Sequence, residues 1–426
     1  MTHSPKWSEL GRAVGLVFAV LLVTSTAHAQ PCLKGTLRIY TSFALLGGAA
    51  ADATGMKNGV DMAVAETGGA VAGYCLEVVS LDNASPQTGK WDEAAEAENA
   101  RKAVADPRAI VYIGPYNSGA AMISARITNR ASMAQITVGA TYPGLTKPGG
   151  SRAGEPYTYR PLALVNFFRP LPADDVQGHA GAEWAKRLGA KKVFVLNDGE
   201  LYGRGIAEVV EATAKRAGLR ILANESFDWK QPDQRSAMTK IRDSGADLVY
   251  IGAVVETGAP LIIRQMFEAD LVAPRVSVMG PDGLLQDALL KQATCEAALA
   301  TELRVTFPGL PIEKMTAVGT KTHRDYKTKF GMEPTTFALY AVEAGRLAID
   351  GIRRAAAELD RASDPTDKRD AVRRAVAATK NFDGINGIWS FDRFGDVDLN
   401  TMSGFKVVRS AESSPGCRFQ FESVVE

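Results

Sequence analysis

Residues 109–138 read AIVYIGPYNSGAAMISARITNRASMAQITV, and this stretch holds one complete strand–helix–strand unit. The apolar run 109–113 predicts a buried strand, and the Gly-Pro pair after it predicts a turn. Residues 118–130 predict a helix, and residues 136–138 predict the next strand. Since strands that alternate with helices form parallel sheets covered on both faces, the stretch indicates an α/β architecture.

The same alternation continues on both sides of this unit. Towards the N-terminus the sequence predicts strands at 36–40 and 76–79 and helices at 55–66 and 91–105. The stretch 144–172 is rich in Gly, Pro and Arg and predicts an exposed connection between lobes. The pattern then restarts, with strands at 192–196, 220–224, 247–251 and 275–278, helices at 205–217, 234–243, 260–268, 312–330, 335–357 and 366–378, and closing strands at 405–408 and 419–424. Two such sets predict two doubly wound lobes.

The length and charge of the chain agree with a two-lobed globular protein. The chain has 426 residues, of which 46% are hydrophobic, and this suffices for a core in each lobe. Lys and Arg together number 49, and Asp and Glu together number 48, without a basic block. Because nucleic-acid binders usually carry a basic face or stripe, we expect no nucleic-acid partner.

The first 29 residues have the pattern of a secretory signal peptide. Lys6 and Arg12 precede an apolar stretch at 13–23, and Ala27-His28-Ala29 forms a cleavage site of the A-x-A type. The alternative is a membrane anchor, but the apolar stretch is too short to span a bilayer comfortably. We therefore expect residues 1–29 to be removed and the mature protein to be free in the periplasm.

The four cysteines all lie after the predicted signal peptide. An even number of cysteines in an oxidising compartment favours two disulfides. Cys32 precedes the first predicted strand and Cys75 opens the second, so these two residues lie together if the strands are parallel neighbours. This favours Cys32–Cys75 and leaves Cys295–Cys417 by elimination, with four buried free thiols as the alternative.

The sequence gives no indication of catalysis. Only His179 and His323 remain after the signal peptide, and neither lies near a G-x-S-x-G string, so the sequence does not indicate a serine hydrolase triad. There is no GxxxxGK[ST] phosphate loop and no cluster of metal-ligating residues. We therefore expect a protein that is not an enzyme and that holds no cofactor or metal.

Seven strings, in order along the chain, resemble the periplasmic binding proteins for leucine, isoleucine and valine that serve ABC importers. The resemblance runs from about residue 36 to about residue 408. The strings are GPYNS at 114–118, VGATYPGLT at 138–146, DVQG at 175–178, NDGELYGRG at 197–205, YIGAVVETG at 250–258, MGPDG at 279–283 and FDRFGD at 391–396. The resemblance implies a type I periplasmic binding fold, whose two lobes close over an interlobe cleft by hinge motion. It implies that residues 30–159 and 280–388 form lobe 1 and that residues 160–279 and 389–426 form lobe 2.

The resemblance also implies how the backbone groups of an amino acid ligand would be held. Ser118 follows a strand and begins a helix, so its hydroxyl and the free N–H groups there can hold a carboxylate. Thr141 would contact the carboxylate and the ammonium, and the carbonyl of Gly139 would accept from the ammonium. Glu256 would pair with the α-ammonium and would separate amino acid receptors from relatives that bind amides or aromatic acids. From the residues alone, Ser118 is equally an N-cap, Thr141 a turn residue and Glu256 a first-turn acid of a helix.

The side-chain pocket is expected from residues that differ partly from the family. Tyr202 stands where the family has a cleft tyrosine, and Tyr142 and Phe337 are further candidates. Tyr116 and Asn117 replace smaller residues, which implies a pocket of different size and polarity. Gly119 stands where the family usually has a second serine.

These observations predict a solute-binding receptor of an ABC importer. It would capture a branched-chain or other hydrophobic amino acid in the periplasm and deliver it to the membrane permease, most simply as a monomer. The alternatives are a receptor for an aromatic or other small carboxylic acid or an amide, and a ligand-sensing domain of a signalling system. Because no output segment follows the last predicted strand, we favour the transport receptor.

Overall fold

The computed structural model describes residues 32–148 and 152–425, and the predicted signal peptide lies outside them. The first lobe is built on a sheet with strand order β2-β3-β1-β4-β5-β6. All neighbouring strands in it are parallel except β2 and β3. Its strands are β1 (Thr36–Phe43), β2 (Ala70–Val71), β3 (Tyr74–Asp82), β4 (Ala109–Ile113), β5 (Ala134–Ile136) and β6 (Phe167–Phe168).

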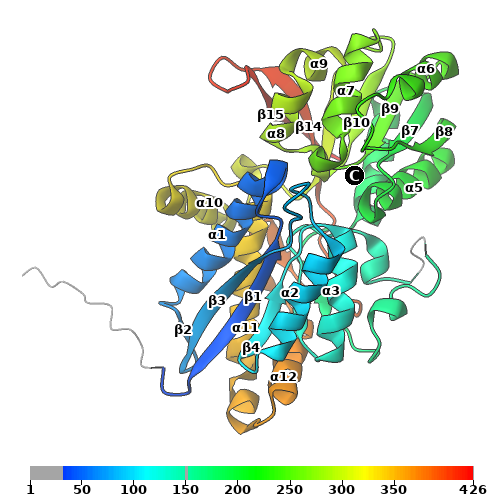
Figure 1. The fold of residues 1–426 in the computed structure, drawn as a ribbon. Coiled ribbons are helices and arrows are strands. Elements are labelled where there is room, and N and C mark those ends of the chain that lie inside the picture. Colours follow the sequence, from blue (N-terminus) through cyan, green and yellow to red (C-terminus); the bar gives the residue numbers. More distant parts are fainter. Residues whose placement is uncertain (1–31, 149–151, 426) are drawn as a thin grey trace, which may run out of the picture.

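Helices cover both faces of this sheet because each presents an apolar side to the strands. The long helix α11 is capped by the hydroxyl of Thr335, which accepts from Ala338 N, and it packs along α1. Helices α11 and α12 come late in the sequence but belong to this lobe, so the orange helices lie beside the blue and cyan ones in Figure 1. The helices are α1 (Ala50–Glu66), α2 (Glu93–Ala105), α3 (Ser118–Arg130), α10 (Ala317–Phe330), α11 (Thr336–Arg361) and α12 (Pro365–Ala377), and β12 (Phe382–Gly384) and β13 (Gly387–Trp389) form a hairpin beside them.

The second lobe is built on a sheet with strand order β15-β14-β11-β10-β9-β7-β8. The strands from β11 to β8 are parallel, and β14 and β15 add an antiparallel edge. Its strands are β7 (Lys192–Asn197), β8 (Arg220–Ser226), β9 (Leu248–Gly252), β10 (Ser277–Gly280), β11 (Arg304–Pro308), β14 (Met402–Arg409) and β15 (Cys417–Val425). Its helices are α4 (Asp174–Arg187), α5 (Leu201–Arg216), α6 (Arg235–Ser244), α7 (Ala259–Glu268), α8 (Asp287–Ala293) and α9 (Cys295–Ala300). The predicted class of two doubly wound α/β lobes is confirmed.

Short 3-10 turns complete the described part of the chain. They are η1 (Gly47–Ala49), η2 (Pro143–Leu145), η3 (Tyr157–Tyr159), η4 (Val255–Thr257), η5 (Asp282–Leu284) and η6 (Ile312–Lys314). None of the helices within 32–148 and 152–425 has the length and apolar character needed to cross a bilayer.

The chain passes between the lobes three times, but later than predicted. Strand β6 belongs to the first sheet, so the first passage follows residue 168 and not residue 159. Strand β11 belongs to the second sheet because it pairs with β10 and β14, and the second passage therefore follows residue 308 and not residue 279. Val397 still packs in the core of the first lobe, so the third passage lies between Val397 and Met402. The predicted boundaries at 160, 280 and 389 are wrong for this reason.

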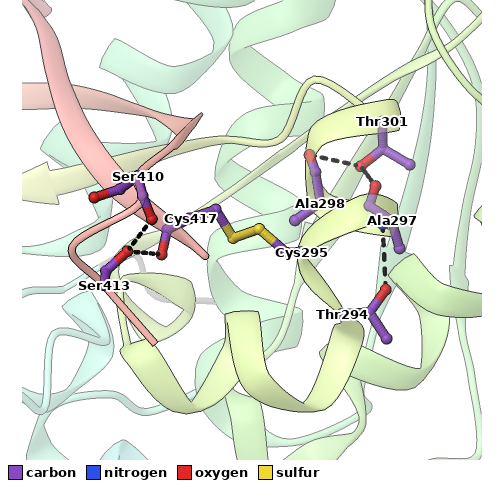
Figure 2. Close-up of a disulfide and its surroundings, with 8 residues drawn as sticks. All are labelled: Thr294, Cys295, Ala297, Ala298, Thr301, Ser410, Ser413 and Cys417. Carbon is purple, nitrogen blue, oxygen red and sulfur yellow. Dashed lines mark hydrogen bonds between the residues drawn. A yellow bond between two sulfur atoms is a disulfide. The ribbon is translucent and has the colours of Figure 1, made fainter. Parts of the chain in front are cut away.

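Each lobe contains one of the two expected disulfides. Parallel pairing places Thr36 opposite Cys75, which brings Cys32 next to Cys75, and these two residues are bonded. Cys295 of α9 is bonded to Cys417 at the start of β15 (Figure 2). The favoured pairing is confirmed, and the second bond fixes the antiparallel edge of the second sheet to the helices that cover it.

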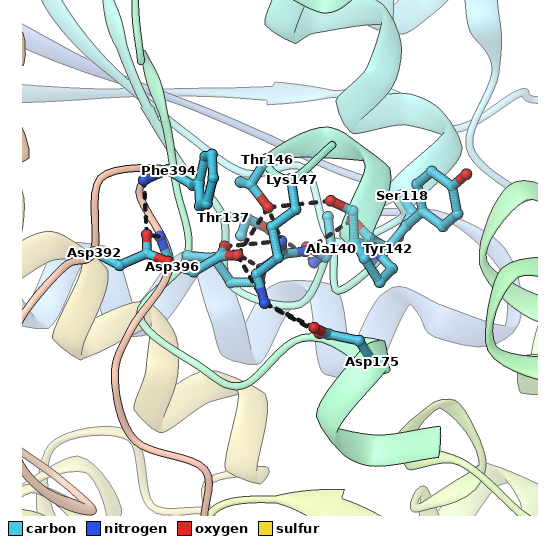
Figure 3. Close-up of polar contacts among 12 residues, drawn as sticks. Ser118, Thr137, Ala140, Tyr142, Thr146, Lys147, Asp175, Asp392, Phe394 and Asp396 are labelled. Carbon is cyan, nitrogen blue, oxygen red and sulfur yellow. Dashed lines mark hydrogen bonds and ion pairs between the residues drawn. The ribbon is translucent and has the colours of Figure 1, made fainter. Parts of the chain in front are cut away.

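A buried ion pair joins the first and third passages between the lobes. Arg169 follows β6 and is fully buried, and its guanidinium donates to Asp396 over 2.9 Å and 3.0 Å. The same guanidinium donates to the carbonyls of Ala140 and Tyr142. Lys147 lies between Asp396 and Asp175, as Figure 3 shows. Burial would raise the pKa of Asp396, but Arg169 and Lys147 hold it below its usual value.

Candidate ligand-binding site

A cavity lies between the lobes, at the carboxyl ends of strands from both sheets. Parallel α/β sheets bind their ligands at this edge. Its non-atom space is about 600 Å³ when the open solvent at its mouth is included, whereas about 30 Å³ is open to the centres of water-sized molecules. Its wall consists of Ala44, Gly89, Lys90, Trp91, Tyr116, Asn117, Ser118, Gly119 and Gly139 from the first lobe, and Asp198, Glu200, Leu201, Tyr202, Val254, Glu256, Thr257 and Asp282 from the second.

Ser118 lies on the cavity wall at the first position of α3. The cap position belongs to Asn117, whose side chain makes no capping bond, so the alternative of Ser118 as an N-cap is wrong. The Ser118 hydroxyl oxygen accepts from Tyr142 N over 3.3 Å, which leaves the hydroxyl proton free to donate. The N–H groups of the first turn of a helix have no intrahelical partner. This corner of the cavity therefore suits a carboxylate.

Gly139 and Thr141 follow β5, where the hydroxyl of Thr137 shapes the turn. This hydroxyl accepts from the N–H groups of Gly139 and Ala140 over 3.2 Å and 2.7 Å. Gly139 lies on the cavity wall. Thr141 is fully buried, and its hydroxyl oxygen has no hydrogen-bond partner within the described residues. Thr141 is not among the described residues of the cavity wall, and its side chain faces the carboxyl group of Asp174.

Aromatic rings line the cavity wall of the first lobe, because two glycines leave space for them. A Cβ at Gly139 would lie 2.3 Å from the ring of Tyr116, and a Cβ at Gly119 would lie 2.5 Å from the ring of Trp91. Gly119 therefore lacks the hydroxyl of the family's second serine, and it also leaves space for the ring of Trp91 at the cavity wall. Sequence reasoning missed Trp91, because nothing local in residues 83–92 indicates a contact with α3.

Asp282 is a second residue that sequence reasoning missed. It lies on the cavity wall directly after β10, and it accepts a hydrogen bond from the hydroxyl of Tyr202. The N–H of Gly283 donates to the same tyrosine oxygen over 3.2 Å. Burial raises the pKa of Asp282 to about 6. Like Glu256, Asp282 is an acid in the loop after a strand, and this pattern in residues 279–283 is the signal that could have found it.

Asp174 lies behind the wall, close to Thr141 and Asp282. It begins α4 and is fully buried, and its N–H donates to the carbonyl of Thr141 over 3.0 Å. Neither of its carboxyl oxygens has a hydrogen-bond partner within the described chain. Burial and the charge of Asp282 raise its pKa well above the usual value. Thr141 and Asp174 thus lie behind the cavity wall, next to Asp282.

Glu256 lies on the wall of the second lobe. It lies in the first turn of the 3-10 helix η4, as the alternative of a first-turn acid expected, and α7 begins only at Ala259. Each carboxyl oxygen exposes less than 1 Å² and has no hydrogen-bond partner within the described residues. Burial, followed by the charge of Asp52, raises the pKa of Glu256 to about 7.

The cavity wall carries more acids than bases. Asp198, Glu200, Glu256 and Asp282 line it, and Lys90 is the one cation among the described lining residues. Asp198 accepts from the hydroxyl of Thr257 and from Glu200 N. The ammonium of Lys90 rests on the ring of Trp229, 3.1 Å from its centroid, and burial lowers its pKa.

The remaining predicted pocket residues divide into two groups. Tyr116, Asn117 and Tyr202 line the cavity as expected. Tyr142 does not, because its hydroxyl donates to Glu155 over 2.7 Å and its ring packs on Gly205. Phe337 stands behind the wall and meets the ring of Tyr116 edge-on at 4.9 Å. The prediction for Tyr142 is therefore wrong, since its hydroxyl is bonded away from the cavity.

Comparison with known proteins finds a family that matches most of the chain. A family described as "Periplasmic binding protein" matches residues 41–409. An "Amino acid binding protein" of Pseudomonas aeruginosa is 31% identical over 209 residues, which is 48% of this chain and 51% of that protein. The chain thus matches about half the length of this curated relative.

Solved structures with a similar fold cover nearly the whole chain. The leucine-binding protein LivK of Thermotoga maritima has a TM-score of 0.75 at 23% identity, covering 92% of this chain and 99% of that one. A solute-binding protein of an ABC transporter from R. palustris, solved in complex with benzoate, has a TM-score of 0.73 at 17% identity, covering 92% and 96%. These likenesses establish the fold.

Proposed function

Because the chain belongs to the periplasmic binding protein family, we propose that it is the solute receptor of an ABC importer and captures an amino acid in the periplasm. The proteins of this family are solute-binding receptors and not enzymes. The proposal includes export by a cleaved signal peptide at residues 1–29, delivery of the ligand to a membrane permease, and action as a monomer.

One observation carries this proposal. A single interlobe cavity combines a helix N-terminus that suits an anion with buried carboxyl groups that suit a cation. An α-amino acid is a zwitterion and complements both. Buried charges are tolerated when they are paired, so the ligand would satisfy groups that the protein leaves unsatisfied.

We place the α-carboxylate at Ser118 and the N-terminus of α3. The α-ammonium then lies beside the hydroxyl of Thr141 and the carbonyl of Gly139, as expected from the sequence. Sequence reasoning gave the ammonium to Glu256. Both of its buried oxygens lack a hydrogen-bond partner within the described residues, so the ammonium would supply one, whereas Asp282 already accepts from Tyr202. Asp282 adds a second negative charge on the cavity wall.

The side chain of the ligand would contact Tyr116, Asn117 and Tyr202. The likeness to a leucine-binding protein favours a branched-chain or other hydrophobic amino acid. The rings of Trp91 and Tyr116 and the side chains of Leu201 and Val254 supply an apolar surface for it.

A thermal-shift screen of the mature protein tests the proposal. The panel comprises the amino acids, the 2-oxo acids with the same side chains, aromatic acids and simple amides. A ligand that binds the folded protein raises its melting temperature by mass action. Stabilisation by amino acids and not by their 2-oxo acids is the expected result, and a panel without any stabilising amino acid would refute it.

A receptor for an aromatic acid is the second candidate. The R. palustris relative was solved with benzoate, and the N-terminus of α3 beside Trp91 and Tyr116 would suit an aromatic carboxylate. It is disfavoured because such a ligand leaves Asp282 and Glu256 without a cation. Stabilisation by benzoate and its hydroxy derivatives alone would establish it in place of the amino acid.

A further inference from the structure

Lys90 and Trp229 make a contact between the two lobes beside the cavity. Lys90 lies on the cavity wall of the first lobe, whereas Trp229 follows β8 in the second lobe. The Lys90 ammonium lies 3.1 Å from the centroid of the Trp229 ring. Trp229 is not among the described residues of the cavity wall, so its ring joins the lobes without belonging to the surface that faces the ligand.

The loop that carries Lys90 is closed within the first lobe. Ala84 and Trp91 form an antiparallel bridge at its base, and Ser85 N donates to the carbonyl of Lys90 over 2.7 Å. Gly89 has a φ of +68°, and a Cβ there would lie 2.5 Å from a backbone atom of η1. The backbone just before Lys90 therefore packs directly on η1, which fixes the point from which its side chain reaches the other lobe.

The loop that carries Trp229 is fixed in a similar way within the second lobe. The side-chain amide of Gln234 donates to the carbonyls of Asp228 and Gln231 over 2.8 Å and 2.9 Å. The backbone N–H of Gln234 donates to the side chain of Gln265 on α7 over 2.8 Å. Because both loops are held in place before the lobes meet, the contact orders few additional groups when it forms.

The charges around the contact favour Lys90 as the cation that joins the lobes. Glu200, Asp198 and Glu256 belong to the second lobe, and their negative charge favours the protonated form of Lys90, although burial lowers its pKa. Lys230 also lies over the Trp229 ring, at 5.3 Å from its centroid, but it belongs to the same lobe as the ring. Only the contact of Lys90 with this ring is therefore made or broken when the lobes move.

A cation–π contact between lobes stabilises one arrangement of the lobes over another. The face of a tryptophan ring attracts cations more strongly than the other aromatic side chains do. Lobes that close by hinge motion bring such partners together and separate them on opening. The contact of η1 with η4 crosses the cleft as well, so the lobes meet at more than one place around the cavity.

We propose that Lys90 and Trp229 form a latch across the cleft, in which Trp229 positions Lys90 and thereby stabilises the closed arrangement of the lobes. This inference rests on the proposed receptor, in which closure retains the solute, and it adds the contact that holds the lobes together. The latch acts on closure and leaves the recognition of the ligand to the cavity wall.

Hydrogen–deuterium exchange of the ligand-free mature protein tests the latch. The readout is the exchange of the backbone N–H groups of η1 and of the first turn of α3, which lie at the cleft. Loss of the ring in Trp229→Leu should lower the ratio of closed to open protein roughly twofold to thirtyfold and speed exchange there at least about twofold. Trp229→Phe keeps an aromatic face and should stay closer to the unchanged protein. Lys230→Met, which removes the cation of the same lobe, is the matched control and should change nothing.

Three results would overturn the latch. The first is equal exchange in Trp229→Leu and the unchanged protein. The second is equal acceleration in Trp229→Leu and Trp229→Phe, because the aromatic face would then not be the cause. The third is acceleration within β4, in the core of the first lobe, because the substitution would then loosen the fold and not the closure.

L-Leucine, added in a second series, tests the proposed function separately. Slower exchange in the first turn of α3 on addition of leucine supports the amino acid receptor. Unchanged exchange there counts against leucine as the solute, whereas the latch is judged from the series without ligand. Failure of the latch and failure of the proposed function are thus distinguishable.

Discussion

Arg169 and Asp396 are 227 residues apart in the sequence, yet they form a buried ion pair that joins the first and third passages between the lobes. The backbones of the two residues also form a parallel β-bridge. The Arg169 guanidinium further donates to the carbonyls of Ala140 and Tyr142, which flank Thr141. The same pair therefore holds the hinge and the loop that carries Thr141.

Replacing Asp396 with Asn should destabilise the protein strongly. The change leaves the Arg169 charge buried without its counter-ion, and removal of one partner of a buried pair costs about 3–5 kcal/mol. Urea denaturation followed by circular dichroism measures the change. Arg275→Met, which removes the exposed pair with Asp270, should cost less than about 1 kcal/mol. Equal effects of the two substitutions would contradict the structural role of the hinge pair.

The pair also predicts a loss of stability in acid. The pKa of Asp396 is lowered in the folded state, so its contribution is complete above the pKa of an unfolded aspartate, about 3.9. It is lost as the pH falls from there through the folded-state pKa. Melting temperatures measured in steps below about pH 4 should fall less steeply in Asp396→Asn than in the unchanged protein. Parallel curves would refute the assignment.

Glu256 predicts the opposite dependence on pH for the ligand-free protein. Its folded-state pKa of about 7 lies above the ordinary value of 4.5, so its protonated form is favoured on folding. The stability that this gives is complete below about pH 4.5 and is lost as the pH rises to about 7, by roughly 3 kcal/mol. Glu256→Gln should therefore raise the stability at about pH 8 and leave it nearly unchanged at about pH 4. A gain of the same size at both pH values would contradict this account.

Ser118 and Glu256 should each contribute to binding every amino acid, whatever its side chain. A hydrogen bond to a charged group is worth about 1.5–3 kcal/mol, so Ser118→Ala should weaken binding roughly 10- to 100-fold. Glu256→Gln should weaken binding at least as much, because it removes the counter-charge of the α-ammonium. Calorimetry with the amino acid that stabilises the mature protein most measures both variants. Unchanged affinity in Glu256→Gln would show that another acid of the cavity wall, such as Asp282, holds the ammonium.

Gly119 and Trp91 should be coupled in their effect on binding. A side chain at position 119 would overlap the ring of Trp91, whose nearest atom would lie 2.5 Å from the new Cβ. Gly119→Ser should therefore displace the ring and weaken binding, although it adds a hydroxyl near the ligand carboxylate. In a double-mutant cycle with Trp91→Ala, the two losses should be less than additive. Full additivity would show that the two residues act independently.

The fold could be predicted from the sequence wherever local pattern and tertiary structure agree. Residues 109–113 and 118–130 have the bounds of β4 and α3, because an apolar run and a helical stretch are separated there by Gly-Pro. Strand β11 could not be predicted in the same way, since Arg304 and Thr306 interrupt its apolar pattern. Its place in the second sheet depends on pairing with β14, which lies about 100 residues further along the chain.

The sequence could predict which loops form the candidate site, but not which way the side chains of those loops point. Ser118, Gly139, Tyr202 and Glu256 all follow strands, and the carboxyl ends of parallel strands meet at one edge. Whether a side chain in such a loop faces the cavity depends on distant partners. Tyr142 turns away because Glu155 accepts from its hydroxyl, and Trp91 turns inward because residue 119 is a glycine.

The most direct test of amino acid capture is a calorimetric comparison of one amino acid with the 2-oxo acid of the same side chain. The amino acid that stabilises the mature protein most should be chosen for it. The account predicts saturable binding of the amino acid and at least about a hundredfold weaker binding of the 2-oxo acid, because the carboxyl groups of Asp282 and Glu256 would face a ligand without an ammonium. Equal affinity for both compounds would contradict the account, since it would mean that the ammonium is not recognised.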